Sequence, residues 1–253
     1  MRRHVPFERL HNFRDLGGYR TGDGRSVQWQ RLYRSDSLGG LEGEDLAAFR
    51  ELGVRTVIDL RHGWEIARRG RVPHEDGLAY HNFSIEHRPF DQVSLGPEVD
   101  PAEYLPERFA ETAADGVREL AQVLRVLVEG EYPVVFHCAS GKDRTGIVSA
   151  LVLTLLGVDE EDVIADFALT ELARERLLAQ WLAEHPGRSP AWPGFGHTPP
   201  AIMRTFLDDL AATYGSVREY CRRYLDVDDE LVAALRRRYT VDSETVDSET
   251  EAG

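Results

Sequence analysis

The chain has 253 residues, of which 42% are hydrophobic, and a formal net charge of −14 at pH 7. This length suits one large α/β domain, and the negative charge argues against wrapping around nucleic acid, whose phosphates select a basic surface. Two cysteines are too few for a disulfide framework, and no run of about eighteen apolar residues indicates a membrane span. We therefore expect a single-domain protein of the reducing cytoplasm, with no signal peptide and no transmembrane segment.

Short strand and helix patterns alternate through the first half of the chain. We expect strands at residues 29–33, 54–60 and 78–85, with a helix at about residues 42–53. One long helical pattern then covers residues 101–129. This order is typical of an α/β fold with a mostly parallel central sheet and helices on both faces.

Asp59 and Arg61 stand at the carboxyl end of the second expected strand, the edge at which open α/β sheets place their ligands. That position makes both of them candidate supporting residues of an active site. The alternative interpretation is a structural pair that fixes the strand to the following turn and to Glu65.

The most informative segment is His-Cys-Ala-Ser-Gly-Lys-Asp-Arg-Thr-Gly at residues 137–146. An apolar run at residues 132–136 precedes it and an apolar helical pattern to residue 156 follows it, which predicts a strand, an anion-binding loop and a helix N-terminus that faces the anion. Five residues separate Cys138 from Arg144. This spacing lets the amides of a tight loop surround a phosphate while the planar guanidinium closes the far side. The positive field of such a loop favours the nucleophilic thiolate.

Two other interpretations of this loop fit its residues less well. A cysteine that merely fills the core needs none of the Gly, Lys, Arg and Thr that follow it. A Walker nucleotide loop needs Ser or Thr directly after its lysine and a glycine further upstream, whereas Asp143 follows Lys142 here.

Four segments together resemble the atypical bacterial tyrosine/serine protein phosphatases, a branch of the cysteine phosphatases related to phosphoinositide phosphatases. They are the signature loop, Asn12-Phe-Arg-Asp-Leu-Gly-Gly-Tyr19, Leu32-Tyr-Arg-Ser35 and Val57-Ile-Asp-Leu-Arg61, in the family's order. The resemblance spans roughly residues 5–240 and implies a cysteine phosphatase-like fold. Low-molecular-weight tyrosine phosphatases carry their cysteine near the N-terminus, so the central position of Cys138 separates this chain from them.

The loop predicts a phosphomonoester hydrolase that uses no metal and no cofactor. We expect Cys138 to form a cysteinyl-phosphate that water hydrolyses, while the loop amides and Arg144 bind the transferring group in place of a magnesium ion. The expected substrate-binding residues are Ala139, Ser140, Gly141, Lys142, Thr145 and Gly146. His137 is expected to orient the loop backbone. Thr145 either donates its hydroxyl to the departing thiolate or serves only in the first helical turn.

The leaving group needs a proton, and the sequence offers several acids. We favour Asp143 in the loop, because nearby phosphate oxyanions would favour its protonated form. The alternatives are Asp91, Glu86 and His87, which follow the third expected strand. Asp91 would match the separate acid loop of related tyrosine phosphatases.

The substrate is expected to be a phosphoprotein or a phosphoinositide. Phosphotyrosine is the first expectation, with dual activity on phosphoserine and phosphothreonine as an extension. Lys142 adds a second cation, which either selects a highly charged substrate such as a phosphoinositide head group or is simply solvated. Arg68, Arg69 and Arg71 either widen this cationic mouth or form a solvated charge run. Nothing in the sequence specifies an oligomeric state.

The last third of the chain is predicted to be a helical cap. We expect the charged helices at residues 159–185 to form a lid over the pocket, and helical patterns return from residue 201 to 239. A direct repeat of Val-Asp-Ser-Glu-Thr then follows, which predicts a disordered acidic tail. Residues 1–240 are therefore assigned to one phosphatase domain and residues 241–253 to the tail.

Two other functions use a similar loop. A phosphate-binding module would keep the pocket with little turnover, but the presence of both Cys138 and Arg144 favours the enzyme, because inactive relatives usually lose one of them. A sulfur-transfer or arsenate-reducing enzyme would need a resolving cysteine, and Cys221 stands in no motif.

Overall fold

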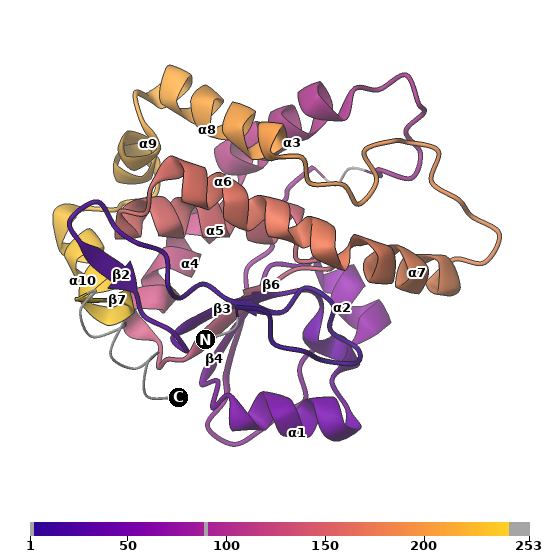
Figure 1. The fold of residues 1–253 in the computed structure, drawn as a ribbon, viewed down its shortest axis with the longest axis horizontal. Helices are drawn as coiled ribbons and strands as arrows, with labels where there is room; N and C mark the ends of the chain where they lie inside the picture. Colours follow the sequence, from indigo (N-terminus) through magenta and orange to yellow (C-terminus); the bar gives the residue numbers. More distant parts are fainter. Residues whose placement is uncertain (1–2, 89–90, 243–253) are drawn as a thin grey trace.

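The computed structural model describes residues 3–88 and 91–242 as a five-stranded sheet covered by helices (Figure 1). The strand order is β1-β3-β6-β4-β5, in which all neighbours are parallel except β1, which is antiparallel at the edge. The strands are β1 (Arg14–Asp15), β3 (Leu32–Ser35), β4 (Thr56–Asp59), β5 (Ala79–Asn82) and β6 (Val134–His137). The mostly parallel sheet predicted from the sequence is confirmed.

A second, two-stranded sheet joins an N-terminal segment to the C-terminal end of the described chain. It pairs β2 (Arg25–Val27) with β7 (Thr240–Asp242) in antiparallel register. The first two residues of the predicted tail, Val241 and Asp242, therefore belong to a strand. Residues 243–253, which make up the rest of that tail, lie outside the described residues.

Helices surround the main sheet. They are α1 (Gly43–Glu51), α2 (Gly63–Arg69), α3 (Pro101–Asp115), α4 (Val117–Glu129), α5 (Asp143–Leu156), α6 (Glu160–Ala168), α7 (Arg174–Glu184), α8 (Pro200–Tyr214), α9 (Val217–Tyr224), α10 (Asp229–Tyr239), and the short 3-10 helices η1 (Leu38–Gly40) and η2 (Leu169–Ala173). The single helix predicted over residues 101–129 is wrong. It is two helices that meet at Gly116, where a side chain would collide with the Ile85 carbonyl.

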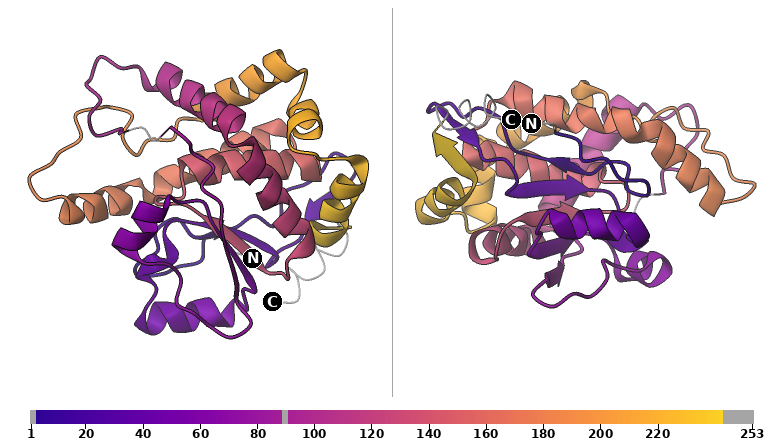
Figure 2. Two further views of the ribbon diagram at one scale, coloured as in Figure 1. Left: turned by 180° about the vertical axis from the view of Figure 1, so that it is seen from behind. Right: turned by 60° about the horizontal axis from the view of Figure 1, so that its bottom comes forward.

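Alternate residues of the parallel strands face two hydrophobic cores, which is why these strands are buried on both sides. Ile58 and Phe136 belong to the larger core, with helices α3 to α6 and α8 to α10. Val57 and Val135 belong to the smaller core, with Phe49 of α1. Figure 2 shows α1 on one side of the sheet and the larger helical layer on the other.

The C-terminal helices form the expected cap and take part in the larger core. Helix α8 packs on α3 and α6, and α10 packs on α4 and α5. Phe206 of α8 and Tyr239 of α10 are fully buried. No helix within residues 3–88 and 91–242 is long and apolar enough to cross a bilayer.

The predicted lid separates into two unlike parts. Helix α6 buries Val163, Ile164 and Phe167 in the core, so this half of the expectation is wrong. All eleven residues of α7 are described, and none of them is buried. Figure 1 shows α7 extending away from the helical layer, next to α2.

Candidate active site

The loop between β6 and α5 lies where the carboxyl ends of three parallel strands meet. In register, Ser35 of β3 and Asp59 of β4 stand on either side of His137, the last residue of β6. The predicted order of strand, loop and helix is confirmed, and α5 begins at Asp143. The loop therefore occupies the edge of the sheet at which α/β folds bind ligands.

Four carbonyl groups of this loop accept hydrogen bonds from neighbouring segments, which turns them outward. The donors and acceptors are Leu60 N–H to the His137 carbonyl at 2.8 Å, Ser37 N–H to Ala139 at 3.1 Å, the Asn12 amide to Ser140 at 3.0 Å, and Arg34 to Gly141 at 2.7 Å. Within the described part of the chain, the amides of residues 139–144 meet no hydrogen-bond acceptor. This leaves a run of N–H groups for an anion.

Gly141 is required at its position in the loop for two reasons. Its φ of +68° lies in the left-handed region, which favours glycine. A Cβ there would lie 2.6 Å from the Ser35 carbonyl oxygen of the neighbouring strand. Gly141 thus lets the loop pass close to β3 and places its carbonyl within reach of Arg34.

A buried ionic network stands behind the loop. Asp166 of α6 accepts from Arg34 at 2.5 Å and from Arg14 at 3.1 Å, and all three side chains are at most 1% exposed. Burial alone would raise the pKa of Asp166, but the two guanidinium groups hold it well below its ordinary range. Because Arg34 also binds the Gly141 carbonyl, this network connects α6 and β1 to the loop.

Cys138 lines a cavity of about 500 Å³ and is itself 2% exposed. Its neighbour His137 places Nδ1 3.2 Å from the Cys138 carbonyl and Nε2 3.5 Å from Asp59. Burial lowers the pKa of His137 to about 4, so the ring is neutral at pH 7. This geometry suits the predicted role of His137 in orienting the loop backbone.

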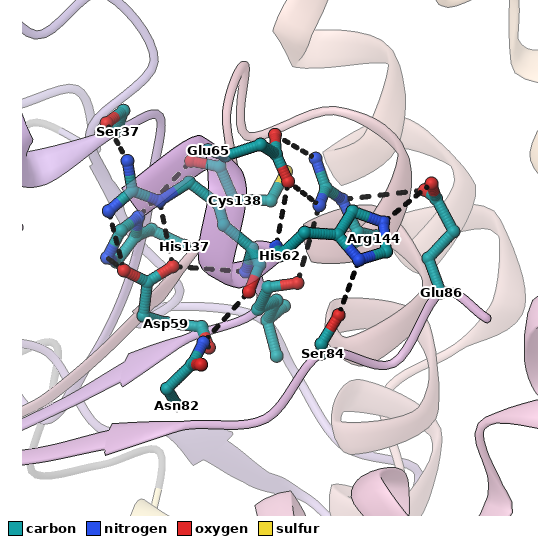
Figure 3. A network of polar contacts seen from close by, with 12 residues as sticks. Ser37, Asp59, His62, Glu65, Asn82, Ser84, Glu86, His137, Cys138 and Arg144 are labelled. Atoms are coloured by element: carbon teal, nitrogen blue, oxygen red, sulfur yellow. Dashed lines mark hydrogen bonds and ion pairs between the residues drawn. The ribbon is translucent and has the colours of Figure 1, made fainter. Parts of the chain in front are cut away.

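Arg144 is clamped by a carboxylate on the helix that follows β4 (Figure 3). Its two terminal nitrogens donate to both oxygens of Glu65, at 2.6 and 2.9 Å. Burial alone would lower the pKa of Arg144, but Glu65 and the charges of Cys138 and Glu86 raise it above its ordinary value. Glu65 also accepts from the His62 amide at the start of α2. The guanidinium is therefore fixed before any substrate binds.

Glu86 lies beside the same guanidinium. Its carboxylate is 3.6 Å from Arg144 Nε on one side and 3.2 Å from His62 Nε2 on the other. Figure 3 shows Glu86 and Ser84 next to His62, at the edge of the network around Cys138. Glu86 lines the cavity and interacts there with both Arg144 and His62.

Asp143 and Asp91 both line the cavity, in different settings. The Oδ1 atom of Asp143 is buried and has no hydrogen-bond partner in the described chain, while Oδ2 accepts from Gln92 at 3.2 Å. The Asp91 side chain is 61% exposed and lies 4.0 Å from Arg188. The third alternative, His87, pairs with Glu119 at the surface.

Asp59 and Arg61 form the structural pair of the alternative interpretation. Arg61 donates to both Asp59 oxygens, to Ser37 and to the Gly70 carbonyl, and both members of the pair are 0% exposed. Neither lines the cavity. The expected bond to Glu65 is wrong, because Glu65 binds Arg144 instead. The pair supports the loop from behind, through the backbone of β4 and through His137.

The remaining loop residues divide into those that line the cavity and those that pack behind it. Ala139, Ser140 and Lys142 line it. Thr145 and Gly146 do not line it, and their contact with substrate stays a prediction. The Thr145 hydroxyl is buried and meets no hydrogen-bond partner among the described residues, and Gly146 lies against Phe167 of α6.

The mouth of the cavity is charged and partly aromatic. Arg68 and Arg69 line it, as one interpretation of their charge run predicted, whereas Arg71 lies over the Tyr80 ring outside it. The opposite wall is α7, which contributes Leu177, Leu178 and Trp181. Arg69 binds Glu184 at 2.5 Å and so connects α2 to α7 across the mouth.

Several residues that build this site were not predicted as site residues. Asn12 and Arg34 lie within the segments that carry the family resemblance, which was the available signal. Glu65 stands at the third position of a helix that starts just after a strand end, and that position could have indicated it. Asp166 stands in an ordinary amphipathic helix, and no sequence pattern distinguishes it.

Other chemistry has little support among the described residues. Cys221 is fully buried in α9, where burial raises the pKa of its thiol to about 12, and it does not line the cavity that holds Cys138. It therefore does not suit the role of a resolving cysteine. No group of three or more His, Cys, Asp or Glu side chains in residues 3–88 and 91–242 could hold a metal ion.

The chain is similar to known phosphatases over most of its length. A family model described as the tyrosine phosphatase family matches residues 5–241. A protein of Cupriavidus necator, provisionally named a tyrosine-protein phosphatase, is 29% identical over 94% of this chain and 89% of its own. Triple specificity protein phosphatase PtpB of Mycobacterium tuberculosis is 32% identical over 62% of this chain and 65% of its own. Among solved structures, P. aeruginosa TpbA matches 84% of this chain and 88% of its own at 20% identity, with a TM-score of 0.30.

Proposed function

This chain belongs to the tyrosine phosphatase family, and from that premise we propose that Cys138 is the nucleophile with which it hydrolyses phosphomonoesters. Arg144 and the loop amides bind the phosphoryl group, and Asp143 supplies the proton to the leaving oxygen. No metal ion takes part in the reaction. Phosphotyrosine in proteins is the principal substrate.

The observation that carries this proposal is the orientation of the loop. Its carbonyls accept hydrogen bonds from neighbouring segments, and its amides, which directly follow Cys138 in the chain, remain available to bind a phosphate. Preorganised donors stabilise developing charge because they need no rearrangement at the moment of reaction. The bidentate bond from Arg144 to Glu65 fixes the remaining cation in the same way.

The reaction has two balanced steps. In the first, the Cys138 thiolate attacks phosphorus, the S–P bond forms, the P–O bond to the leaving group breaks, and the leaving oxygen takes a proton from Asp143. In the second, water attacks phosphorus and gives its proton to the Asp143 carboxylate, while the S–P bond breaks and releases the thiolate and inorganic phosphate. Asp143 thus acts first as an acid and then as a base.

Asp143 is supported as the acid by its placement. It follows the loop directly, it lines the cavity, and its buried Oδ1 has no hydrogen-bond partner in the described chain, with Lys142 Nζ 3.5 Å away. The Gln92 amide orients the other oxygen. Asp91 is exposed at the mouth and pairs with Arg188, so its carboxylate is not held in place inside the cavity.

The range of substrates follows from the walls of the cavity. Trp64, Trp181 and Phe195 line it, and such rings suit an aryl phosphate. The Lys142 side chain is 3% exposed and also lines the cavity, which supports extension to more highly charged substrates. We therefore propose phosphoserine, phosphothreonine and phosphoinositides as further substrates. Because the nucleophile must be a thiol, we assign the activity to a reducing compartment such as the cytoplasm.

The proposal is tested by phosphate release from a panel of phosphopeptides and soluble phosphoinositides, with and without a chelator. We expect the highest kcat/KM on phosphotyrosine peptides, no effect of the chelator, and a loss of at least about a thousandfold in Cys138→Ser. Turnover that survives in Cys138→Ser, or that the chelator abolishes, would contradict the proposal. Tight phosphopeptide binding without turnover in the unaltered chain would support the binding-module alternative instead.

A further inference from the structure

One arginine of the cavity, Arg174, differs from the others because it makes neither a hydrogen bond nor an ion pair within 4 Å among the described residues, and Glu171 acts on it only through its charge at longer range. Arg174 begins α7 and lines the cavity, and its Nε atom is buried. In residues 3–88 and 91–242 its guanidinium meets no hydrogen-bond acceptor, and no carboxylate lies within 4 Å of it. Arg174 as a whole is partly exposed, so its guanidinium is accessible to an anion from outside the chain, and a buried Nε–H without an acceptor favours one.

Each of the other cations that line the cavity lies within 4 Å of a carboxylate or an imidazole ring. Arg144 binds Glu65, Arg69 binds Glu184, Arg188 lies 4.0 Å from Asp91, Lys142 lies 3.5 Å from Asp143, and Arg68 lies 3.1 Å from the His185 ring. Glu171 is the acidic residue one turn before Arg174. It binds His197 and the Thr198 amide instead of Arg174.

Arg174 is also held on a firm base, unlike the rest of α7. The preceding residue, Ala173, is 1% exposed, and Thr170 of η2 is fully buried. Thr170 accepts from Asn12, the residue that also binds the loop carbonyl of Ser140. The stem of Arg174 passes over Gly196, where an added Cβ would lie 3.5 Å from its Cγ. The start of α7, from which the Arg174 side chain extends, is thus attached to Asn12, which also binds the phosphate loop.

Lys142 provides a second observation on the same cavity. Its side chain is 3% exposed, and its Nζ atom is buried with no hydrogen-bond partner in the described chain, Asp143 being 3.5 Å away. Besides Arg144 of the phosphate site, which is bonded to Glu65, the cavity therefore contains two further cations, Lys142 and Arg174, that donate no hydrogen bond within the described chain. A substrate that presents only one phosphate would leave Arg174 unused.

Resting on the proposed phosphatase function, we propose that Arg174, assisted by Lys142, forms a second anion subsite for an acidic or phosphorylated side chain next to phosphotyrosine in a peptide substrate. A peptide is favoured because the wall beside Arg174 is apolar, with Leu177, Leu178 and Phe195. Peptide side chains carry apolar surface for such a wall, whereas an inositol ring carries mainly hydroxyl groups. A planar guanidinium also matches a carboxylate or phosphate with two parallel hydrogen bonds.

The test compares pairs of phosphotyrosine peptides that differ only in Glu or Gln at the flanking positions. For the unaltered chain we expect a roughly tenfold higher kcat/KM on the Glu peptide, the effect of one charge-assisted hydrogen bond at a partly exposed site. Arg174→Gln should remove this preference, and added salt should weaken it in the unaltered chain. Arg71→Gln is the matched control, because Arg71 lies over the Tyr80 ring outside the cavity, and it should keep the preference.

The outcomes separate this inference from the proposed function. If p-nitrophenyl phosphate hydrolysis depends on Cys138 but Arg174→Gln keeps the full preference for Glu, the subsite is overturned and the phosphatase function stands. Absence of any preference in the unaltered chain would overturn it as well. A third arm uses soluble inositol mono- and bisphosphates: an effect of Arg174→Gln confined to these would overturn the peptide assignment. Far-ultraviolet circular dichroism of each variant checks that it is folded.

Discussion

The back and the mouth of the cavity are built in opposite ways. Behind the phosphate loop, Arg14, Arg34 and Asp166 are fully buried and bonded to one another and to the loop. At the mouth, α7 has no buried residue among its eleven, all of them described, and crosses the opening through surface pairs such as Arg69 with Glu184. We infer that the residues behind the loop hold the groups that react with phosphate in place, whereas the residues at the mouth determine which substrates bind.

This difference has an energetic basis. A buried charge that loses its partner is costly, so the residues behind the loop are constrained together and a change at one affects all of them. Exposed ion pairs are worth little and are screened by salt, so residues at the mouth can change without loss of the fold.

Asp166→Asn should have the largest effect, because it leaves two buried arginines with one neutral partner. We expect a loss of about 3–5 kcal/mol in the free energy of unfolding, measured by urea denaturation, and a loss of phosphatase activity in the molecules that remain folded. Asp91→Asn, which removes an exposed carboxylate of the mouth, is the matched control and should change stability by less than about 0.5 kcal/mol. If the two substitutions lowered the free energy of unfolding equally, the residues behind the loop would be no more constrained than those at the mouth.

Arg144→Lys should abolish most activity while leaving the fold intact. A lysine keeps the charge beside Glu65 but cannot bind a carboxylate and a phosphate with one planar group. We expect kcat/KM to fall by about 10²–10³, the cost of removing one preorganised donor to the transferring group. The measurement is steady-state hydrolysis of a phosphotyrosine peptide, and a loss below about threefold would show that Arg144 does not bind the reacting phosphate.

Asp143→Asn and Asp91→Asn distinguish the two candidate acids. Loss of the general acid should lower kcat by about 10²-fold and remove the basic limb of the pH–rate profile. We expect this result for Asp143→Asn only. If Asp91→Asn alone loses the basic limb, the acid comes from the mouth and Asp143 has only a supporting role.

His137 should make stability depend on pH. Burial lowers its pKa from 6.5 to about 4 in the folded state, so the unfolded state binds more protons between these values and stability falls as the pH is lowered through this window. For this group alone we expect a loss of about 2 kcal/mol between pH 7 and pH 5. Asp15, whose pKa burial raises to about 6, acts in the opposite direction, because its contribution is lost as the pH rises.

The contribution of His137 to the pH dependence of stability is therefore measured as the difference between the unaltered chain and His137→Gln. Urea denaturation of the unaltered chain and of His137→Gln at both pH values isolates it, since Asp15 is common to both. The acid sensitivity should be smaller in His137→Gln by about the same 2 kcal/mol. An unchanged sensitivity would show that His137 is not buried as the neutral ring.

The two regions also differ in how far the sequence predicts them. The strand, loop and helix around Cys138 follow from local patterns and from a motif in which each residue has a separate physical reason. The bonds from Asn12 and Arg34 to the loop span more than a hundred residues of sequence, and only the family resemblance indicated that those segments matter. Asp166 could not have been predicted, because a buried acid in an amphipathic helix resembles any polar residue of its exposed face.

The mouth was predicted least well, for a related reason. Charged residues such as Arg68 and Arg71 look alike in sequence, yet one lines the cavity and the other packs on Tyr80. The lid expected at residues 159–185 is likewise two unlike helices, because burial by α8 and α5 holds α6 in the core. Packing between segments that are distant in sequence determines which residue of a charge run faces the site. A local sequence pattern therefore cannot predict which one it is.

The most direct test of this account is rapid acid quenching of the enzyme during turnover of a phosphotyrosine peptide, followed by intact-mass analysis and peptide mapping. We predict a transient protein species that is heavier by one phosphoryl group, with the group bound to the sulfur of Cys138. A phosphoryl group mapped to any other residue, or rapid turnover with no covalent species at any quench time, would contradict the claim that this thiol attacks phosphorus.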